Sequence, residues 1–241
     1  MRTSNVIRLL ACMAAGSAWL SAGPLSVLSY DMLNGEAHTF SYMDKTYNGS
    51  GSPTVGLSPL SGGKGLLTDG GTGVTDFTAD LGHGAAYEWV GWALTGANFS
   101  PPDTNDTFAT MTFKLSSAAD INSISLFINN FSTLTSGVGI FNTATVSFSN
   151  DDVTFVNPII YTTTAAQRAD STARFITIPL NQVNPYQYVQ VHLTHTSNWV
   201  FLSEVTFDGT APGSSPTTPE PSSLLLSALG VFGLGWKLRR R

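Results

Sequence analysis

The chain has 241 residues, of which 42% are hydrophobic, and its formal net charge is −5. The charge is unevenly distributed, because residues 31–208 carry five basic and fifteen acidic side chains, a net charge of −10, between two basic ends. An acidic body repels phosphate backbones and anionic lipid, so the composition argues against nucleic-acid binding. In an exported protein the same acidic side chains fit calcium binding.

The N-terminal residues 1–22 have the pattern of a secretory signal peptide. Two arginines precede an apolar stretch at residues 9–20, and small residues follow it. Cleavage after Ala18 and cleavage after Ala22 both satisfy the small-residue rule. We therefore expect the chain to be exported.

The single cysteine, Cys12, lies inside this predicted signal peptide. A lipoprotein cleavage site at Cys12 is disfavoured, because Arg8 leaves almost no hydrophobic region before it. The exported chain is then free of cysteine, so it uses neither disulfides nor thiolate metal ligands. Its stability outside the cell must come from a packed core or from a bound hard metal ion.

Residues 30–209 are predicted to form one all-β domain, a single jelly-roll β-sandwich, and roughly 180 residues are enough for a full core. Glycine, serine, threonine, asparagine and proline are densest at residues 48–73 and 98–105, which predicts long turns. No amphipathic helix is evident. Period-two alternation or apolar β-branched runs predict the strands, which are residues 109–115, 123–128, 143–149, 174–179, 188–193 and 199–207.

Three tryptophans of this domain, Trp89, Trp92 and Trp199, lie in apolar, strand-like surroundings. Large aromatic side chains in such surroundings usually fill the core. We therefore predict core packing for all three rather than a platform for stacking a sugar.

The sequence contains no nucleophile elbow, zinc-protease helix, phosphate-binding loop or dinucleotide-binding motif. His192 and His195 are expected on opposite faces of one strand, which makes them poor partners for one metal ion. Two acid pairs are expected to be solvated turn residues and not the carboxylate pair of a glycosidase: Asp103 with Asp106, and Asp151 with Asp152. We therefore expect no enzymatic activity.

A short extended linker at residues 210–218 leads to a C-terminal segment with three parts. These parts are Pro219, Glu220 and Pro221, then an apolar run at residues 224–236, then a basic cluster that ends the chain. This order over residues 219–241 resembles the PEP-CTERM sorting signal of Gram-negative bacteria. The resemblance implies cleavage near the Pro-Glu-Pro by an exosortase, a membrane transpeptidase-like enzyme.

The apolar run also predicts a transient membrane anchor. Extended to residues 222–238, it approaches the lower limit of about 17 residues for a transmembrane helix. The basic end is expected in the cytoplasm and the rest of the chain outside. An inner-membrane-anchored intermediate would then pass to the cell surface or the extracellular matrix, although an ordinary tail anchor that is never cut is the alternative.

Seven segments of the body carry a second resemblance. In chain order they are residues 65–70, with a Leu-Thr-Asp-Gly turn; 88–92, Glu-Trp-Val-Gly-Trp; 111–115; 121–128; 139–155, with Ser-Asn-Asp-Asp; 173–178; and 199–205, Trp-Val-Phe-Leu-Ser-Glu-Val. They resemble the discoidin, or factor V/VIII type C, family and its relatives, the family 32 carbohydrate-binding modules. The resemblance spans most of residues 41–209 and implies a galactose-binding-like jelly roll. Lys114-Leu115-Ser116 and Asp152 depart from the family pattern and mark a distant member.

The same resemblance implies a structural calcium ion. Glu204 lies within an apolar run, where an unpaired charge is costly to bury, and Asp69 forms a turn pair with Gly70. In the family, the equivalents of Asp69 and Glu204 hold the ion with backbone carbonyls and a hydroxyl, for which Thr72 and Thr75 are candidates. The alternative is that Glu204 is exposed on an edge strand and that Asp69 only shapes its turn.

Two functions remain in competition. The resemblance implies a binding module that grips extracellular polysaccharide through loops at one end of the sandwich, and polar and aromatic candidates for that face are His83, Tyr87, Asn130 and Phe131. The alternative is a structural or adhesive matrix protein of the biofilm or cell envelope, without a defined sugar site. The composition of the loops fits both.

Overall fold

The structure is a computed structural model, and it describes residues 22–36, 41–75, 88–94, 103–130 and 137–211. The chain divides into two compact units, one of residues 22–213 and one that joins residues 1–21 to residues 214–241. The second unit lies outside the described residues, and with it most of the predicted signal peptide and the whole sorting segment. Within the part of the chain that is described, no helix is long and apolar enough to cross a membrane.

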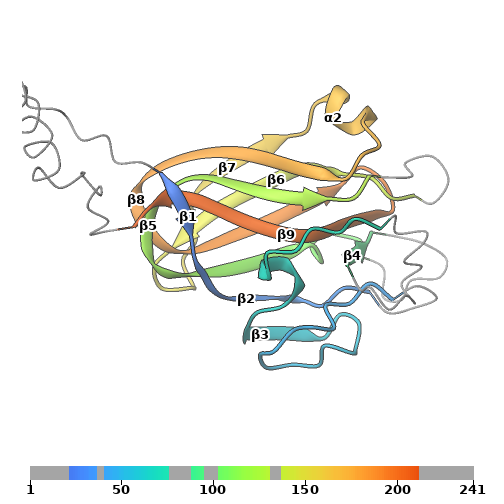
Figure 1. Cartoon of the computed structure of the whole chain (residues 1–241), viewed down its shortest axis with the longest axis horizontal. Helices are drawn as coiled ribbons and strands as arrows, with labels where there is room; N and C mark the ends of the chain where they lie inside the picture. Colours follow the sequence, from blue (N-terminus) through green and yellow to red (C-terminus); the bar gives the residue numbers. More distant parts are fainter. Residues whose placement is uncertain (1–21, 37–40, 76–87, 95–102, 131–136, 212–241) are drawn as a thin grey trace, which may run out of the picture. The chain divides into compact units, whose positions relative to one another are not determined.

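The described residues form nine strands and two short helices. All nine strands belong to one hydrogen-bonded sheet, which folds over into a two-layer sandwich (Figure 1). In chain order the elements are β1 (Gly23–Leu25), β2 (Val27–Leu33), β3 (Pro59–Gly63), the 3₁₀ helix η1 (Leu66–Thr68), β4 (Val90–Ala93), β5 (Thr110–Ile128), β6 (Phe141–Ser149), β7 (Val156–Thr162), α2 (Ala165–Ala169), β8 (Arg174–His195) and β9 (Trp199–Thr210). The predicted all-β sandwich is confirmed.

Two long strands, β5 and β8, run through both layers. Residues 110–114 of β5 pair with β2 and with the last part of β8, whereas residues 121–128 pair with β9 and with the first part of β8. Register shifts between Lys114 and Ser123 mark the bend. One layer therefore contains β3, β2, β5, β8, β6 and β7, and the other contains β8, β5 and β9 with β1 and β4 at the edge of β9.

The bends explain how the strand predictions differ from the structure. The runs predicted at residues 109–115 and 123–128 are one strand, β5, and those at residues 174–179 and 188–193 are one strand, β8. At each bend the period-two pattern is interrupted while the strand continues, so the sequence pattern breaks where the structure does not. The strands predicted at 143–149 and 199–207 correspond to β6 and β9.

The sequence pattern did not predict the first four strands, β1 to β4, or β7. β3 contains two glycines, and β7 lies at the sheet edge with mostly exposed residues. Neither therefore shows the alternation that burial of one face imposes. The region 48–73, expected to be long turns, contains β3 and η1.

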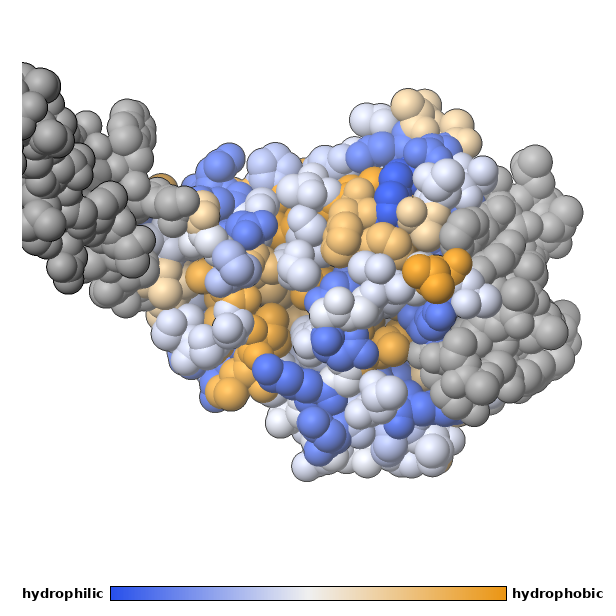
Figure 2. Space-filling model, viewed as in Figure 1, coloured by the Kyte–Doolittle hydropathy of each residue, from blue (hydrophilic) through white to orange (hydrophobic). Residues whose placement is uncertain are grey.

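The three tryptophans fill the core, as predicted. Trp89, Trp92 and Trp199 are all buried. The indole N–H of Trp92 donates to the backbone oxygen of Leu33 at 2.9 Å, and that of Trp89 donates to the backbone oxygen of Thr75 at 2.8 Å. On the face shown in Figure 2, apolar residues are interspersed with hydrophilic ones.

The short helix α2 was not predicted. Thr164 caps it through a capping box with Gln167, which satisfies N–H groups at the start of the helix. α2 lies at the end of the sandwich opposite to β1 (Figure 1).

Candidate functional site

One candidate site forms where η1 meets β9. The 3₁₀ helix ends at Thr68, Asp69 is its C-cap residue, and Gly70 follows with φ of +85°, a conformation that glycine adopts without strain. This turn directs the N–H of Gly70 to Oε2 of Glu204 at 3.0 Å. Asp69 and Glu204 are thus brought to one pocket of about 330 Å³, the acid pocket, whose polar lining also includes Lys64 and Thr68.

The Glu204 side chain is buried in the β9 strand, with 4% of its surface exposed. The alternative that it is exposed on an edge strand is wrong. Burial and, to a smaller extent, the negative charge of Asp69 raise the pKa of Glu204, whereas the hydrogen bond from Gly70 lowers it, and the net result is a pKa of about 7. A buried carboxyl group beside a second carboxylate favours either a proton or a cation at this place.

The acid pocket has a further oxygen atom for a cation. The hydroxyl oxygen of Thr68 is buried and has no hydrogen-bond partner among the described residues, and Thr68 lines the same pocket as Asp69 and Glu204. Carboxylate and hydroxyl oxygens are the ligands that Ca²⁺ prefers. No group of three or more His, Cys, Asp or Glu side chains gathers as a metal site in the described part of the chain, so a cation here would also need hydroxyl or carbonyl ligands.

The two threonine candidates lie beside the acid pocket, in the segment that follows Asp69. Thr72 is exposed and lines a neighbouring pocket with Asp69 and Glu88. The backbone N–H of Thr75 donates to Oε2 of Glu88 at 2.6 Å. Thr68 and Glu88 were not predicted from the sequence. Only the tertiary fold shows that the Thr68 hydroxyl is left without a hydrogen bond in the described residues and that the Glu88 carboxylate holds the segment after Asp69.

This segment is held against β9. The N–H of Gly73 donates to the hydroxyl of Ser203 at 2.9 Å. A Cβ atom at Gly73 would lie 2.4 Å from the Trp89 ring, so glycine is required by the close approach. The position of Asp69 is therefore coupled to the core through the chain that follows it.

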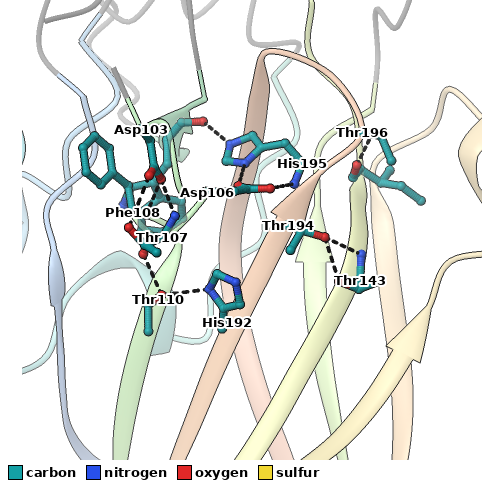
Figure 3. Close-up of polar contacts among 12 residues, drawn as sticks. Asp103, Asp106, Thr107, Phe108, Thr110, Thr143, His192, Thr194, His195 and Thr196 are labelled. Atoms are coloured by element: carbon teal, nitrogen blue, oxygen red, sulfur yellow. Dashed lines mark hydrogen bonds and ion pairs between the residues drawn. The ribbon is translucent and has the colours of Figure 1, made fainter. Parts of the chain in front are cut away.

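A second group of polar side chains lies where β8 ends (Figure 3). His195 is buried; its Nε2 lies 3.0 Å from the backbone oxygen of Trp92, and its Nδ1 contacts Oδ1 of Asp106. Since a carbonyl oxygen only accepts, Nε2 carries a proton. The backbone N–H of His195 also donates to Asp106 at 2.9 Å, so His195 ties the chain before β5 to β8 and β4.

His192 lies on the other face of β8, as predicted, where its Nδ1 is 3.0 Å from the hydroxyl of Thr110 (Figure 3). Both histidines serve hydrogen bonds within the fold. Their opposite orientation prevents them from holding one ion together.

The expectation that Asp103 is a solvated turn residue is wrong. Asp103 is 2% exposed, and its carboxylate accepts the N–H groups of Thr107 and Phe108. Nearby, burial and the charge of Asp103 raise the pKa of the Glu36 carboxyl, whereas the backbone N–H of Ala93 lowers it, and the net result is a pKa of about 7. A carboxylate that orders its own turn can be buried, because the backbone N–H groups replace water.

Asp151 and Asp152 do lie in an exposed turn, as predicted. The carboxylate of Asp151 accepts from the N–H groups of Val153 and Thr154. These hydrogen bonds and that of Ser149 hold the pKa of Asp151 well below its usual range. Asp151 therefore shapes the turn between β6 and β7.

Of the four residues expected at a sugar-binding face, only Asn130 lies among the described residues. It is fully buried, and its amide N–H groups donate to the backbone oxygens of Arg168 and Asp170, at 3.3 and 2.5 Å. Its side-chain oxygen is buried without a hydrogen-bond partner in the described part of the chain. The other three, His83, Tyr87 and Phe131, lie outside the described residues.

The fold is that of a galactose-binding-like β-sandwich. Its two bent strands, β5 and β8, belong to both layers, and the Asp69-Gly70 turn packs against β9. The chain belongs to the family described as discoidin domain-containing receptor 1/2, DS-like domain, whose model matches residues 26–209. Residues 217–241 match the PEP-CTERM protein-sorting motif. Both resemblances expected from the sequence are therefore confirmed.

A curated relative is the discoidin domain-containing receptor tyrosine kinase B of Caenorhabditis elegans, which is 25% identical over 186 residues. The match covers 76% of this chain but 21% of the relative, so the chain spans about a fifth of that protein.

One similar solved structure is a mutant of the lectin binding domain of Lectinolysin complexed with Lewis b. The TM-score is 0.39 and the sequence identity is 13%, and the match covers 79% of this chain and 92% of that one. CBM32-3 from a family 31 glycoside hydrolase of Clostridium perfringens has a TM-score of 0.37 at 20% identity, covering 51% and 75%.

Proposed function

We propose that this protein is an exported, non-catalytic β-sandwich protein, sorted by an exosortase-type system to the cell surface or matrix, where it binds polysaccharide. The observation that carries the proposal is the union on one chain of a discoidin-type domain with a PEP-CTERM motif. The motif supports export and sorting, with a membrane-anchored intermediate. The resemblance to sugar-binding relatives supports a saccharide ligand, although a fold by itself does not specify one.

The polysaccharide is proposed to meet the loops that carry His83, Tyr87, Asn130 and Phe131. Support comes from the position of Asn130, whose two amide hydrogen bonds anchor the C-terminal end of α2 to the chain just after β5. Aromatic rings beside polar groups give the mixed surface on which sugars stack.

Binding to the exopolysaccharide of the producing cells and to a glycan array tests this function. We expect saturable binding to one class of glycan, weakened at least tenfold by Tyr87→Ala or Phe131→Ala. Val183→Ala is the control, because Val183 is 80% exposed in the bend of β8. Absence of binding to every glycan would overturn the sugar-binding proposal and favour the structural matrix role.

We also propose that the acid pocket holds a structural calcium ion. Asp69, Glu204 and the hydroxyl of Thr68 would supply protein ligands, with Thr72 or Thr75 as further candidates. The fit rests on the buried Glu204 beside Asp69 and on the unpartnered Thr68 hydroxyl. The ion would neutralise the two carboxylates and hold η1 against β9.

Calcium at 100 times its Kd is expected to raise the melting temperature by about 5–10 °C. Asp69→Asn and Glu204→Gln should abolish this rise. Asp208→Asn is the matched control, since Asp208 lies on the same strand but does not line the acid pocket. An identical melting temperature in calcium and in chelator would rule the site out.

A further inference from the structure

A second pocket lies on the outer face of the layer that contains β2, β5 and β8. The register aligns Ser29 with Lys114 and Lys114 with Tyr188 across these strands, and Asp31 with Thr112 in the next row. Because side chains alternate along a strand, these five residues share the face opposite to the core. Together with Asp152 they line a pocket of about 190 Å³, which we call the sheet pocket.

One wall of the sheet pocket is the end of β3. The carboxylate of Asp31 accepts the hydroxyl of Ser61 at 2.9 Å and the N–H of Gly62 at 2.8 Å. Gly62 has φ of +73°, so the chain turns sharply here. Asp31 therefore fixes this wall, and both of its oxygens are engaged in doing so.

The opposite wall is the turn between β6 and β7, which carries Asp152. The hydroxyl of Ser149 accepts the N–H groups of Asp151 and Asp152, both at 3.1 Å. Asn150 donates to the backbone oxygen of Pro185 at 3.1 Å, which ties the turn to β8. Both walls are thus held by hydrogen bonds that require no ligand, and such preorganisation lowers the entropic cost of binding.

Several polar groups in the sheet pocket are left unused. The ammonium group of Lys114 lies 5.4 Å from the centre of the Tyr188 ring and makes no hydrogen bond or ion pair within the described residues. The carboxylate of Asp152 likewise accepts no hydrogen bond from them. Asp31, Lys114 and Asp152 line the same pocket, and partial burial and the charge of Asp31 raise the pKa of Asp152, while the charge of Lys114 lowers it.

These groups select the chemistry of a ligand. The carboxylates of Asp31 and Asp152 would repel an anionic ligand, and the ammonium group of Lys114 would repel a cationic ligand. A neutral polyhydroxy ligand avoids both conflicts, since its hydroxyls donate to Asp152 and accept from Lys114 and Tyr188. The pocket is small and open, which fits one sugar ring or the end of a chain rather than a long groove.

We propose that the sheet pocket binds a neutral saccharide residue, with Asp152 as hydrogen-bond acceptor and Lys114 and Tyr188 as donors. This site is separate from the loop residues and the acid pocket of the preceding subsection, and it stands or falls independently of them. A protein with two separated sugar sites would link two polysaccharide chains, which raises avidity without new contacts.

The test uses the full chain, labelled with ¹⁵N-lysine in a zwitterionic detergent. The sequence has four lysines, Lys45, Lys64, Lys114 and Lys237, so the spectrum reports one backbone signal from each. The probes are glucose, galactose, mannose and N-acetylglucosamine, each up to about 50 mM, a concentration that saturates a site with a Kd of about 1 mM. Galacturonic acid and glucosamine serve as charged probes.

We expect a saturable shift of the Lys114 signal with at least one neutral sugar and little change at Lys64. Asp152→Asn and Tyr188→Leu should weaken that binding at least tenfold, and Asp120→Asn, a matched control outside the pocket, should not. The unchanged signals of Lys45 and Lys64 show that each variant is folded.

Two kinds of result would overturn the proposal. The first is no shift at Lys114 with any neutral sugar, or tighter binding of a charged probe. The second is sugar binding that survives Asp152→Asn and Tyr188→Leu but is lost in Tyr87→Ala, which would support the loop site of the proposed function and exclude the sheet pocket.

Discussion

Glu204 illustrates at the scale of one residue how burial and charge set the chemistry of this domain. It sits in β9 with its carboxyl facing Asp69, and its pKa of about 7 lies above the ordinary value of 4.5. The folded protein therefore binds the Glu204 proton more tightly than the unfolded chain does. By linkage, ionisation of Glu204 opposes folding.

The sign of this effect gives a prediction. In chelator, the unfolding free energy should fall as pH rises from about 4.5 to about 7, and the loss should be complete above that range. Glu204→Gln should flatten this fall, because glutamine does not ionise. Urea midpoints at pH 5 and pH 8 measure the difference. Glu36, whose pKa is also about 7, contributes a remaining slope of the same sign, so an unchanged slope in Glu204→Gln would contradict the prediction.

At the scale of elements, the part of the chain that runs from the end of β2 through β3 to η1 is organised by a buried carboxylate. Asp44 is fully buried and accepts the hydroxyl of Tyr30, the hydroxyl of Thr46 at 2.9 Å and the N–H of Leu66 at 3.1 Å. It therefore links β2 to the start of η1. A Cβ atom at Gly65 would lie 2.4 Å from this carboxylate, so the approach is close.

Asp44→Asn should loosen this connection, because the amide presents a donor to groups that are themselves donors. We expect a loss of about 1.5–3 kcal/mol in unfolding free energy. Amide hydrogen exchange should accelerate in residues 41–69 and remain slow in the centres of β5 and β8. Asp120→Asn is the control, and equal acceleration across the whole domain would show that Asp44 stabilises the fold without a local role.

At the scale of the whole molecule, the β-sandwich forms its own compact unit. Residues 22–213 form one compact unit, and the larger of its two core clusters contains residues of both β5 and β8. The cysteine of the chain, Cys12, lies outside this unit. The unit therefore depends on packing and not on disulfides.

A fragment of residues 22–213 should fold alone. We expect one cooperative unfolding transition, within about 2 °C of the matching transition of the full chain, and no change on adding a reductant, because no disulfide crosslinks the fragment. Thermal unfolding followed by far-ultraviolet circular dichroism measures this. Two transitions, or a marked loss of stability, would show that residues outside the unit support it.

The all-β class, the core tryptophans and the sorting motif could be read from the sequence, because each depends on residues close together in the chain. Alternation marks a strand locally, and the Pro-Glu-Pro, apolar and basic parts follow one another directly. The resemblance to the discoidin family also predicted that Asp69 and Glu204 lie close together, and in the structure both line one pocket.

The tertiary structure decided what depends on distant residues. The burial of Asp44 and Asp103 follows from N–H groups that the fold supplies, and the sheet pocket follows from the register of β2, β5 and β8. Periodicity reports which face of a strand a residue takes, but not which strand lies beside it or where that strand bends. The physical reason is that register and bends are set by packing across the whole sheet.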